Sequence, residues 1–227
     1  MGLRASGDAR CIDTFKDALE IATKIGAKSA RLSCVHNLAL AYATVPAVRN
    51  LHEAAKWSKI AIEECAVFDV LRLGQCHKLA GFILQEQLKE AVSRDSPDVL
   101  QSKADNALAH LLMALKILPA DASDDLAETH LVAGSVYRII GRHAVALDYL
   151  QQSLRYWMRQ LNVSRAAEVQ LEMAHNFAEA GDIAAALEYA RAADEGCKSS
   201  GRVGLRVSEA ARVLVRRLSP DYGGFNS

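Results

Sequence analysis

The chain has 227 residues, 51% of them hydrophobic, so it is long enough to bury one large core or two small ones. Its 27 lysines and arginines balance 27 aspartates and glutamates, which excludes a global field that would recruit nucleic acid or an anionic membrane. Four prolines and 6% aromatic residues favour helices over sheets.

The N-terminus and the cysteines indicate an intracellular protein. No stretch of about eighteen uncharged apolar residues occurs, and MGLRASGDAR lacks the apolar region of a secretory signal. The five cysteines are odd in number and form no C-x-x-C pair, which is typical of a reducing compartment. We therefore expect a soluble, cytoplasmic chain whose cysteines are small buried hydrophobes.

The first predicted helix, at residues 9–25, reads as the second helix of a pair whose first is missing. Ile12, Phe15, Leu19 and Ala22 fall on one side of it. Because no earlier helix would cover this face, we expect a homo-oligomer or the docking of another domain through it. The chain would then be the C-terminal part of a longer protein, or its first repeat would have degenerated.

Helix pairs are predicted at 28–66 and 68–118. NLALAY (37–42) and KLAGFI (78–83) mark their first helices. In the second pair the first helix extends through LQEQLKEAVSRD, Ser96-Pro97 starts the next helix, and Pro119 stops it.

The clearest repeat joins YRIIGRHAVALDYLQQSL (137–154) to FAEAGDIAAALEYARAAD (177–194), forty positions later. Gly141 and Gly181 each separate two helical runs, so each is expected to end a helix in a left-handed cap. Antiparallel pairs at 123–161 and 164–198 follow. The small and aromatic positions that recur let the helices approach and fill the space between them: Gly134, Tyr137, Ala146, Leu147 and Tyr149, matched by Ala174, Phe177, Ala186, Leu187 and Tyr189.

A last helix is predicted at 203–218, before a tail at 219–227. One face is apolar, formed by Val203, Val207, Ala210, Ala211, Leu214 and Leu218, and the arginines mostly lie elsewhere (Arg202, Arg206, Arg212, Arg216 and Arg217). We interpret it as a capping helix with a solvated outer face. A nucleic-acid patch is the alternative, which the absence of interleaved aromatic residues disfavours.

The pattern small-x-x-aromatic, Gly, then Ala-Leu-x-Tyr resembles the tetratricopeptide repeat, in its long form of about forty residues found in kinesin light chains and cell-polarity adaptors. The resemblance implies an all-α fold, a right-handed α-solenoid of about ten helices in a single domain over 1–227. It also implies a scaffold or adaptor that binds a peptide or helix of another protein in a concave groove lined by the first helices. From the balanced charge we expect no nucleic-acid or membrane partner.

Matching the repeats residue by residue gives the expected groove positions, which we place outside the inter-helix core. The predicted ligand groove comprises Ser33, His36, Asn37, Leu40, His77, Lys78, Glu128, Leu131, Val132, Ser135, Arg138, Glu168, Leu171, Glu172, His175 and Glu179, together with Gly74 and Gly81. Its C-terminal end would be acidic and its middle apolar. A chaperone tail is disfavoured, because His36 and Leu40 stand where chaperone-binding members carry a carboxylate clamp.

No motif carries catalysis. G-x-S-x-G and a phosphate-binding glycine loop are absent from the sequence, and the seven histidines show no ligand spacing such as H-E-x-x-H. We therefore predict no enzyme, no cofactor and no metal, although Glu168, Glu172 and His175 could form a cleft with perturbed titratable groups. The alternative function is the sensor or regulatory arm of a larger regulator whose effector domain is not in this chain.

Overall fold

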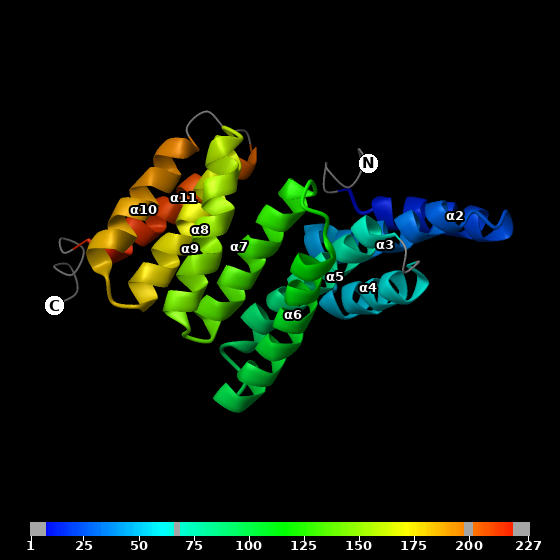
Figure 1. Ribbon diagram of the computed structural model, residues 1–227, viewed down its shortest axis with the longest axis horizontal. Coiled ribbons are helices and arrows are strands. Elements are labelled where there is room, and N and C mark those ends of the chain that lie inside the picture. The colour runs from blue at the N-terminus through cyan, green and yellow to red at the C-terminus, as the bar shows by residue number, and fades with distance from the viewer. Residues whose placement is uncertain (1–7, 66–68, 198–201, 220–227) are drawn as a thin grey trace. The chain divides into compact units, whose positions relative to one another are not determined.

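A computed structural model of the chain describes residues 8–65, 69–197 and 202–219. Within these ranges it contains ten α-helices and one short 3-10 helix, and no strand (Figure 1). The helices pack in sequential antiparallel pairs, which confirms the prediction of an all-α protein with about ten helices. The contacts divide the chain into two compact units, Met1–Asp125 (unit 1) and Leu126–Ser227 (unit 2).

Unit 1 begins with three helices joined by short connections, and ends with the longest pair. Its helices are α2 (Cys11–Lys24), α3 (Lys28–Thr44), the 3-10 helix η1 (Pro46–Val48), α4 (Leu51–Glu64), α5 (Val70–Ala91) and α6 (Pro97–Ile117). Two of these helices have a side-chain N-cap. The Asn50 side chain accepts hydrogen bonds from the amides of His52 and Glu53 at the start of α4, and the Asp69 side chain accepts one from the amide of Arg72 at the start of α5.

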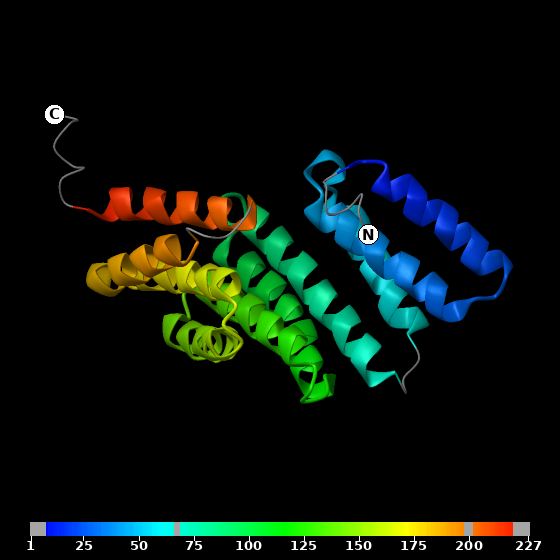
Figure 2. The same cartoon turned by 90° about the horizontal axis from the view of Figure 1, so that it is seen from above.

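The face of α2 that was expected to be open is covered by α3. Ile12 is 6% exposed and Ala22 4%. Phe15 and Leu19 are partly buried against residues of α3, and Figure 2 shows α2 and α3 side by side. The reason for expecting self-association through this face is therefore wrong, because the face packs inside unit 1. The oligomeric state itself stays a prediction.

Unit 2 holds the regular repeat. Its helices are α7 (Ser123–Ile139), whose first three residues belong to unit 1, α8 (His143–Arg159), α9 (Val163–Glu179), α10 (Ile183–Gly196) and α11 (Arg202–Leu218). The pairs predicted at 123–161 and 164–198 correspond to α7–α8 and α9–α10. The predicted tail, apart from Ser219, lies outside the described residues.

One turn geometry connects α7 to α8, α8 to α9 and α9 to α10. Gly141 and Gly181 have φ of 74° and 88°, which confirms the predicted left-handed caps, and Leu161 adopts the same region with φ of 54°. The next amide in each turn donates to a carbonyl five residues earlier, at 2.9 or 3.0 Å: Arg142 to Tyr137, Asn162 to Trp157, and Asp182 to Phe177. These bonds satisfy carbonyls that the end of a helix leaves free.

The core of unit 2 follows the repeated aromatic positions. Tyr137 stacks on Tyr149 with ring centroids 5.3 Å apart, and Phe177 stacks on Tyr189 at the same distance. Leu150, Val169 and Met173 are fully buried beside them. Aromatic residues therefore fill the space inside both helix pairs, as the sequence predicted.

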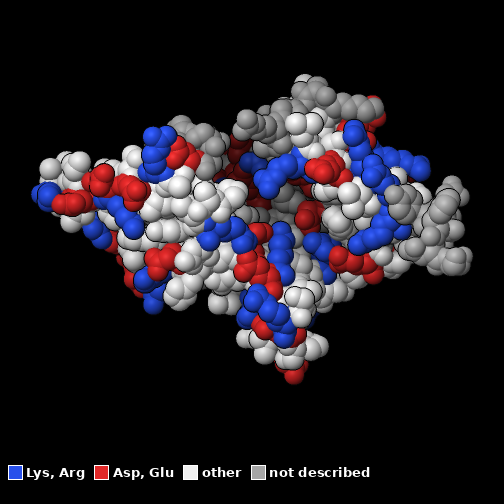
Figure 3. All heavy atoms as spheres, turned by 180° about the vertical axis from the view of Figure 1, so that it is seen from behind, with Lys and Arg blue, Asp and Glu red and all other residues white. Residues whose placement is uncertain are grey.

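Within the described ranges, no helix combines the length and the apolar character that crossing a bilayer requires. On the face shown in Figure 3, lysines and arginines lie beside aspartates and glutamates, in agreement with the zero net charge of the chain.

Candidate functional site

Helix α11 is held on the pair α9–α10 by an apolar stripe and a polar anchor. Leu171 of α9 packs against two buried clusters that contain Ala211 and Leu214 of α11, and Val207 and Leu218 of α11 pack against the same two clusters. These four α11 residues share one face of that helix. Asp194 of α10 accepts a hydrogen bond from Ser208 Oγ at 2.5 Å and from Arg212 Nε at 3.0 Å. Helix α11 thus covers part of the α9 face that the sequence assigned to the groove. The side chain of Val203, predicted on the apolar face, lies outside those described.

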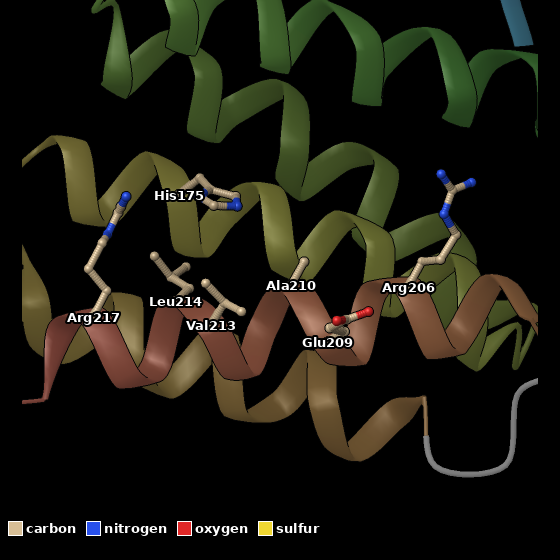
Figure 4. A pocket seen from close by; sticks show the side chains of 7 residues that line it. All are labelled: His175, Arg206, Glu209, Ala210, Val213, Leu214 and Arg217. Carbon is tan, nitrogen blue, oxygen red and sulfur yellow. The ribbon is translucent and has the colours of Figure 1, made fainter. Parts of the chain in front are cut away.

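Beside this contact lies an open cavity of about 420 Å³ (Figure 4). His175 contributes from α9, and α11 contributes Arg206, Glu209, Ala210, Val213, Leu214 and Arg217. Val213 is 57% exposed although it is apolar. In Figure 4 the two arginines lie at opposite ends of the apolar residues, and they are eleven positions apart on the helix, a rise of about 16 Å. The site therefore has an apolar wall and two cationic ends.

His175 provides a polar group at the wall of this cavity. Burial is the main cause that lowers its pKa, and the neighbouring charges act in both directions: Glu172 raises the pKa and Arg138 lowers it. The imidazole is therefore neutral near pH 7, where it can donate one hydrogen bond and accept another.

The predicted acidic residues of unit 2 are all paired with arginines of the same unit. Arg138 donates to Glu172 at 3.2 Å and to Glu179 at 2.5 Å, and Arg165 donates to Glu168 at 2.9 Å and to Glu128 at 2.7 Å. The Arg138 side chain is only 13% exposed. These contacts gather five predicted residues into two clusters, and the two arginines compensate half of the negative charge of the four glutamates that were expected to attract a basic ligand.

The predicted polar residues of unit 1 are also engaged. Asn37 Nδ2 donates to the carbonyl of Ser33 at 2.8 Å, one turn earlier on its own helix. His36 Nδ1 lies 4.0 Å from Cys76 Sγ. Lys78 Nζ lies 2.5 Å from Asp125. Burial acts to raise the pKa of the Asp125 carboxyl, but the hydrogen bonds from Gln75 and Lys78 outweigh it and hold this pKa below its usual range.

His77 meets a residue that the sequence did not single out. Its Nδ1 lies 3.0 Å from Nδ1 of His110 on α6. Burial lowers the pKa of both imidazoles.

Three predicted leucines contribute to the packing between helices. Leu40 packs on the α3–α4–α5 cluster, Leu131 on the core of unit 2, and Leu171 under α11. The expectation that groove positions lie outside the inter-helix core is therefore wrong for these three. Val132 is half-buried and Ser135 is 1% exposed.

Gly74 and Gly81 were expected to line the groove, and this is wrong. A Cβ on Gly74 would lie 2.6 Å from Leu118, and a Cβ on Gly81 would lie 2.5 Å from Leu111. Both glycines therefore face the C-terminal end of α6, where they allow the two backbones to approach closely.

Sequence reasoning missed the α11 residues that line the cavity, because it read their arginines as a solvated outer face. The available signal was the spacing of Arg206, Ala210, Val213 and Arg217 at i, i+4, i+7 and i+11. This spacing places an apolar pair between two cations on one stripe of the helix.

The thiols of Cys34, Cys65, Cys76 and Cys197 are protonated near neutral pH. None of the five cysteines forms a disulfide, and four of them are buried. Burial raises the pKa of Cys76 to about 12, and it raises the pKa of the Cys34, Cys65 and Cys197 thiols as well. A buried thiol in apolar surroundings is a poor nucleophile.

Comparison of the sequence with protein-family models and with curated proteins finds no match.

Proposed function

We propose that the chain is a cytoplasmic protein-interaction module, a scaffold or adaptor that binds a peptide or a helix of another protein. In this proposal the helix pairs form a right-handed solenoid similar to tetratricopeptide arrays. The proposal is supported by the sequential antiparallel pairs, by the turn shared by Gly141 and Gly181, and by the two aromatic stacks at a forty-residue interval. All three features belong to a fold built by repetition.

The observation that carries the proposal is the cavity between α9 and α11. It is open to solvent, its wall is formed by apolar groups such as Ala210 and Val213, and charged groups lie at its ends. An apolar centre with a polar rim is the usual anatomy of a recognition surface.

The test is affinity capture from cell extract with quantitative mass spectrometry, using a variant that fills the cavity. Ala210→Trp places a large ring in the site. Ala184→Trp is the matched control, because Ala184 is exposed on α10 and does not line the cavity. A partner that binds through the cavity should be captured equally by the wild type and by Ala184→Trp, and at least tenfold less by Ala210→Trp.

Circular dichroism and the melting temperature establish that both variants are folded. If all three folded proteins capture the same partners in the same amounts, the α9–α11 cavity is not the binding surface. Crosslinking from the first helices α3, α5 and α7 would then locate the ligand.

A further inference from the structure

Two histidines from different helices of unit 1 meet at the α5–α6 contact. His77 Nδ1 and His110 Nδ1 lie 3.0 Å apart, and the ring centroids are 5.2 Å apart with a tilt of 36°. Both side chains are half-buried. The residues are 33 positions apart in the sequence, so only the folded pair brings them together.

The contact between His77 and His110 is fixed by the close packing of the α5 and α6 backbones. Gly74, His77 and Gly81 share one face of α5, at i, i+3 and i+7. His77 therefore stands between Gly81, which faces Leu111 of α6, and Gly74, which faces Leu118 just after α6 ends. Leu111, which packs on Gly81, is adjacent to His110. Helices positioned in this way hold their side chains more precisely than loops do.

The separation of the two nitrogens matches the bite of a single metal ion. Imidazole nitrogens bind zinc at about 2.0–2.1 Å, so two of them on one ion lie about 2.8–3.4 Å apart for angles between about 90° and 109°. The observed 3.0 Å lies inside this interval. We infer that His77 and His110 form a two-histidine site for a divalent transition metal such as Ni²⁺, Cu²⁺ or Zn²⁺.

The protonation of the pair is compatible with binding. A neutral imidazole has a lone pair on one ring nitrogen, so each ring of the pair can offer one to a metal ion. In the metal-free pair one Nδ1 must carry the proton that the other accepts. Binding requires this proton to move to Nε2, which is a change of tautomer and leaves the charge of the imidazoles unaltered.

The metal site would have coordination positions that the protein does not fill. In the described part of the chain no group of three His, Cys, Asp or Glu side chains converges as a metal site, so the protein supplies two ligands and water supplies the others. Imidazole ligands favour Ni²⁺, Cu²⁺ and Zn²⁺ over Mg²⁺ and Ca²⁺, which prefer oxygen. This inference is independent of the proposed function, because its residues belong to unit 1 and the cavity belongs to unit 2.

The test is calorimetric titration of tag-free protein with NiCl2 in a buffer that does not bind metals, repeated with MgCl2. The wild type should bind one Ni²⁺ per chain at this site and should show no corresponding Mg²⁺ signal. His77→Gln and His110→Gln keep a side chain that can hydrogen-bond across the helices, but they remove an imidazole ligand, and each should weaken Ni²⁺ binding at least tenfold. His52→Gln is the control, because His52 is exposed on α4 and should leave binding unchanged.

Ni²⁺ should also raise the melting temperature of the wild type and of His52→Gln, but not that of the two site variants, since only a ligand of the folded state stabilises it. The inference is overturned if the wild type shows no Ni²⁺ binding, or if folded His77→Gln and His110→Gln bind Ni²⁺ as the wild type does. In either case the pair is only a hydrogen bond that joins α5 to α6.

Discussion

The α5–α6 crossing of unit 1 and the α7–α8 crossing of unit 2 are built on the same contacts but carry different ring pairs. In each, a glycine of the first helix faces a leucine of the second, and a carbonyl oxygen four residues before that leucine lies close to the glycine. The corresponding residues are Gly81, Leu111 and Ala107 in unit 1, and Gly134, Leu150 and Ala146 in unit 2. The crossing itself is therefore the part of the repeat that both units keep.

The rings lie in the same register around these contacts. His77 and His130 each stand four residues before the glycine, while His110 and Tyr149 each stand three residues after the alanine. The ring centroids are 5.2 Å apart for His77–His110 and 5.7 Å apart for His130–Tyr149. Unit 1 thus carries two nitrogen ligands where unit 2 carries a histidine and a phenol. The two ring pairs differ at one position only, which is His110 in unit 1 and Tyr149 in unit 2.

The largest expected effect tests whether the two crossings are equivalent. Gly81→Ala and Gly134→Ala would place a Cβ 2.5 Å from Leu111 Cγ and 2.7 Å from Leu150 Cγ. Because the leucines are fully buried and the neighbouring carbonyls are backbone atoms, the helices must shift, and each variant should lose about 1–3 kcal/mol of unfolding free energy. Urea unfolding measures the loss.

Gly196→Ala is the matched control for both. Its Cβ would come no closer than 3.3 Å to Val163, and a helical alanine is favoured over glycine, so its change should be near zero. A loss confined to one of Gly81→Ala and Gly134→Ala would show that the crossings differ in how far their helices can move apart.

The repeat of unit 2 could be predicted because glycine and aromatic residues mark it. Gly141 and Gly181 mark the turns, and Tyr137 and Phe177 recur forty residues apart. The helix boundaries and the aromatic stacks therefore follow from the sequence. In unit 1 the connections vary. The η1 helix and an Asn50 cap join α3 to α4, whereas Ser96-Pro97 begins α6. Because these connections differ, the sequence of unit 1 shows no constant interval from which the pairing of α5 with α6 could be predicted.

The site residues were harder to predict for a physical reason. The sequence places a residue on a face of its helix, but it does not say which neighbour covers that face. Leu171 was expected to face a ligand and instead packs under α11. His77 was expected to face the groove and instead meets His110, because the register of α5 against α6 is set by contacts such as Gly81 on Leu111.

A smaller effect sharpens the comparison of turns within unit 2. Leu161 occupies the left-handed position that glycine holds at 141 and 181, and it is 84% exposed, so it gains little from burial. Leu161→Gly should relieve the steric cost of that conformation and stabilise the protein by about 0.5–1 kcal/mol, after the greater freedom of glycine in the unfolded chain is counted. The melting temperature should rise.

Gln160→Gly is the control for this turn. Gln160 has φ of −80° and is exposed, so glycine relieves no strain there and should lower the melting temperature slightly. If Leu161→Gly destabilises the protein instead, the exposed leucine makes contacts that outweigh the strain of its backbone.

The smallest expected effect would move the metal chemistry of unit 1 into unit 2. Tyr149→His places a second imidazole beside His130, in the register that His110 holds beside His77, and should add a second Ni²⁺ to the stoichiometry measured by calorimetry. This site should be weaker than the first, because the rings of His130 and Tyr149 are farther apart. Tyr189→His is the matched control: it makes the same change in the next pair, where Gln170 stands in place of His130. If Tyr189→His also adds a Ni²⁺, a single histidine is sufficient and the register is irrelevant. If neither variant adds one while the wild type binds Ni²⁺ through His77 and His110, the closer approach of α5 and α6 is what makes the first site.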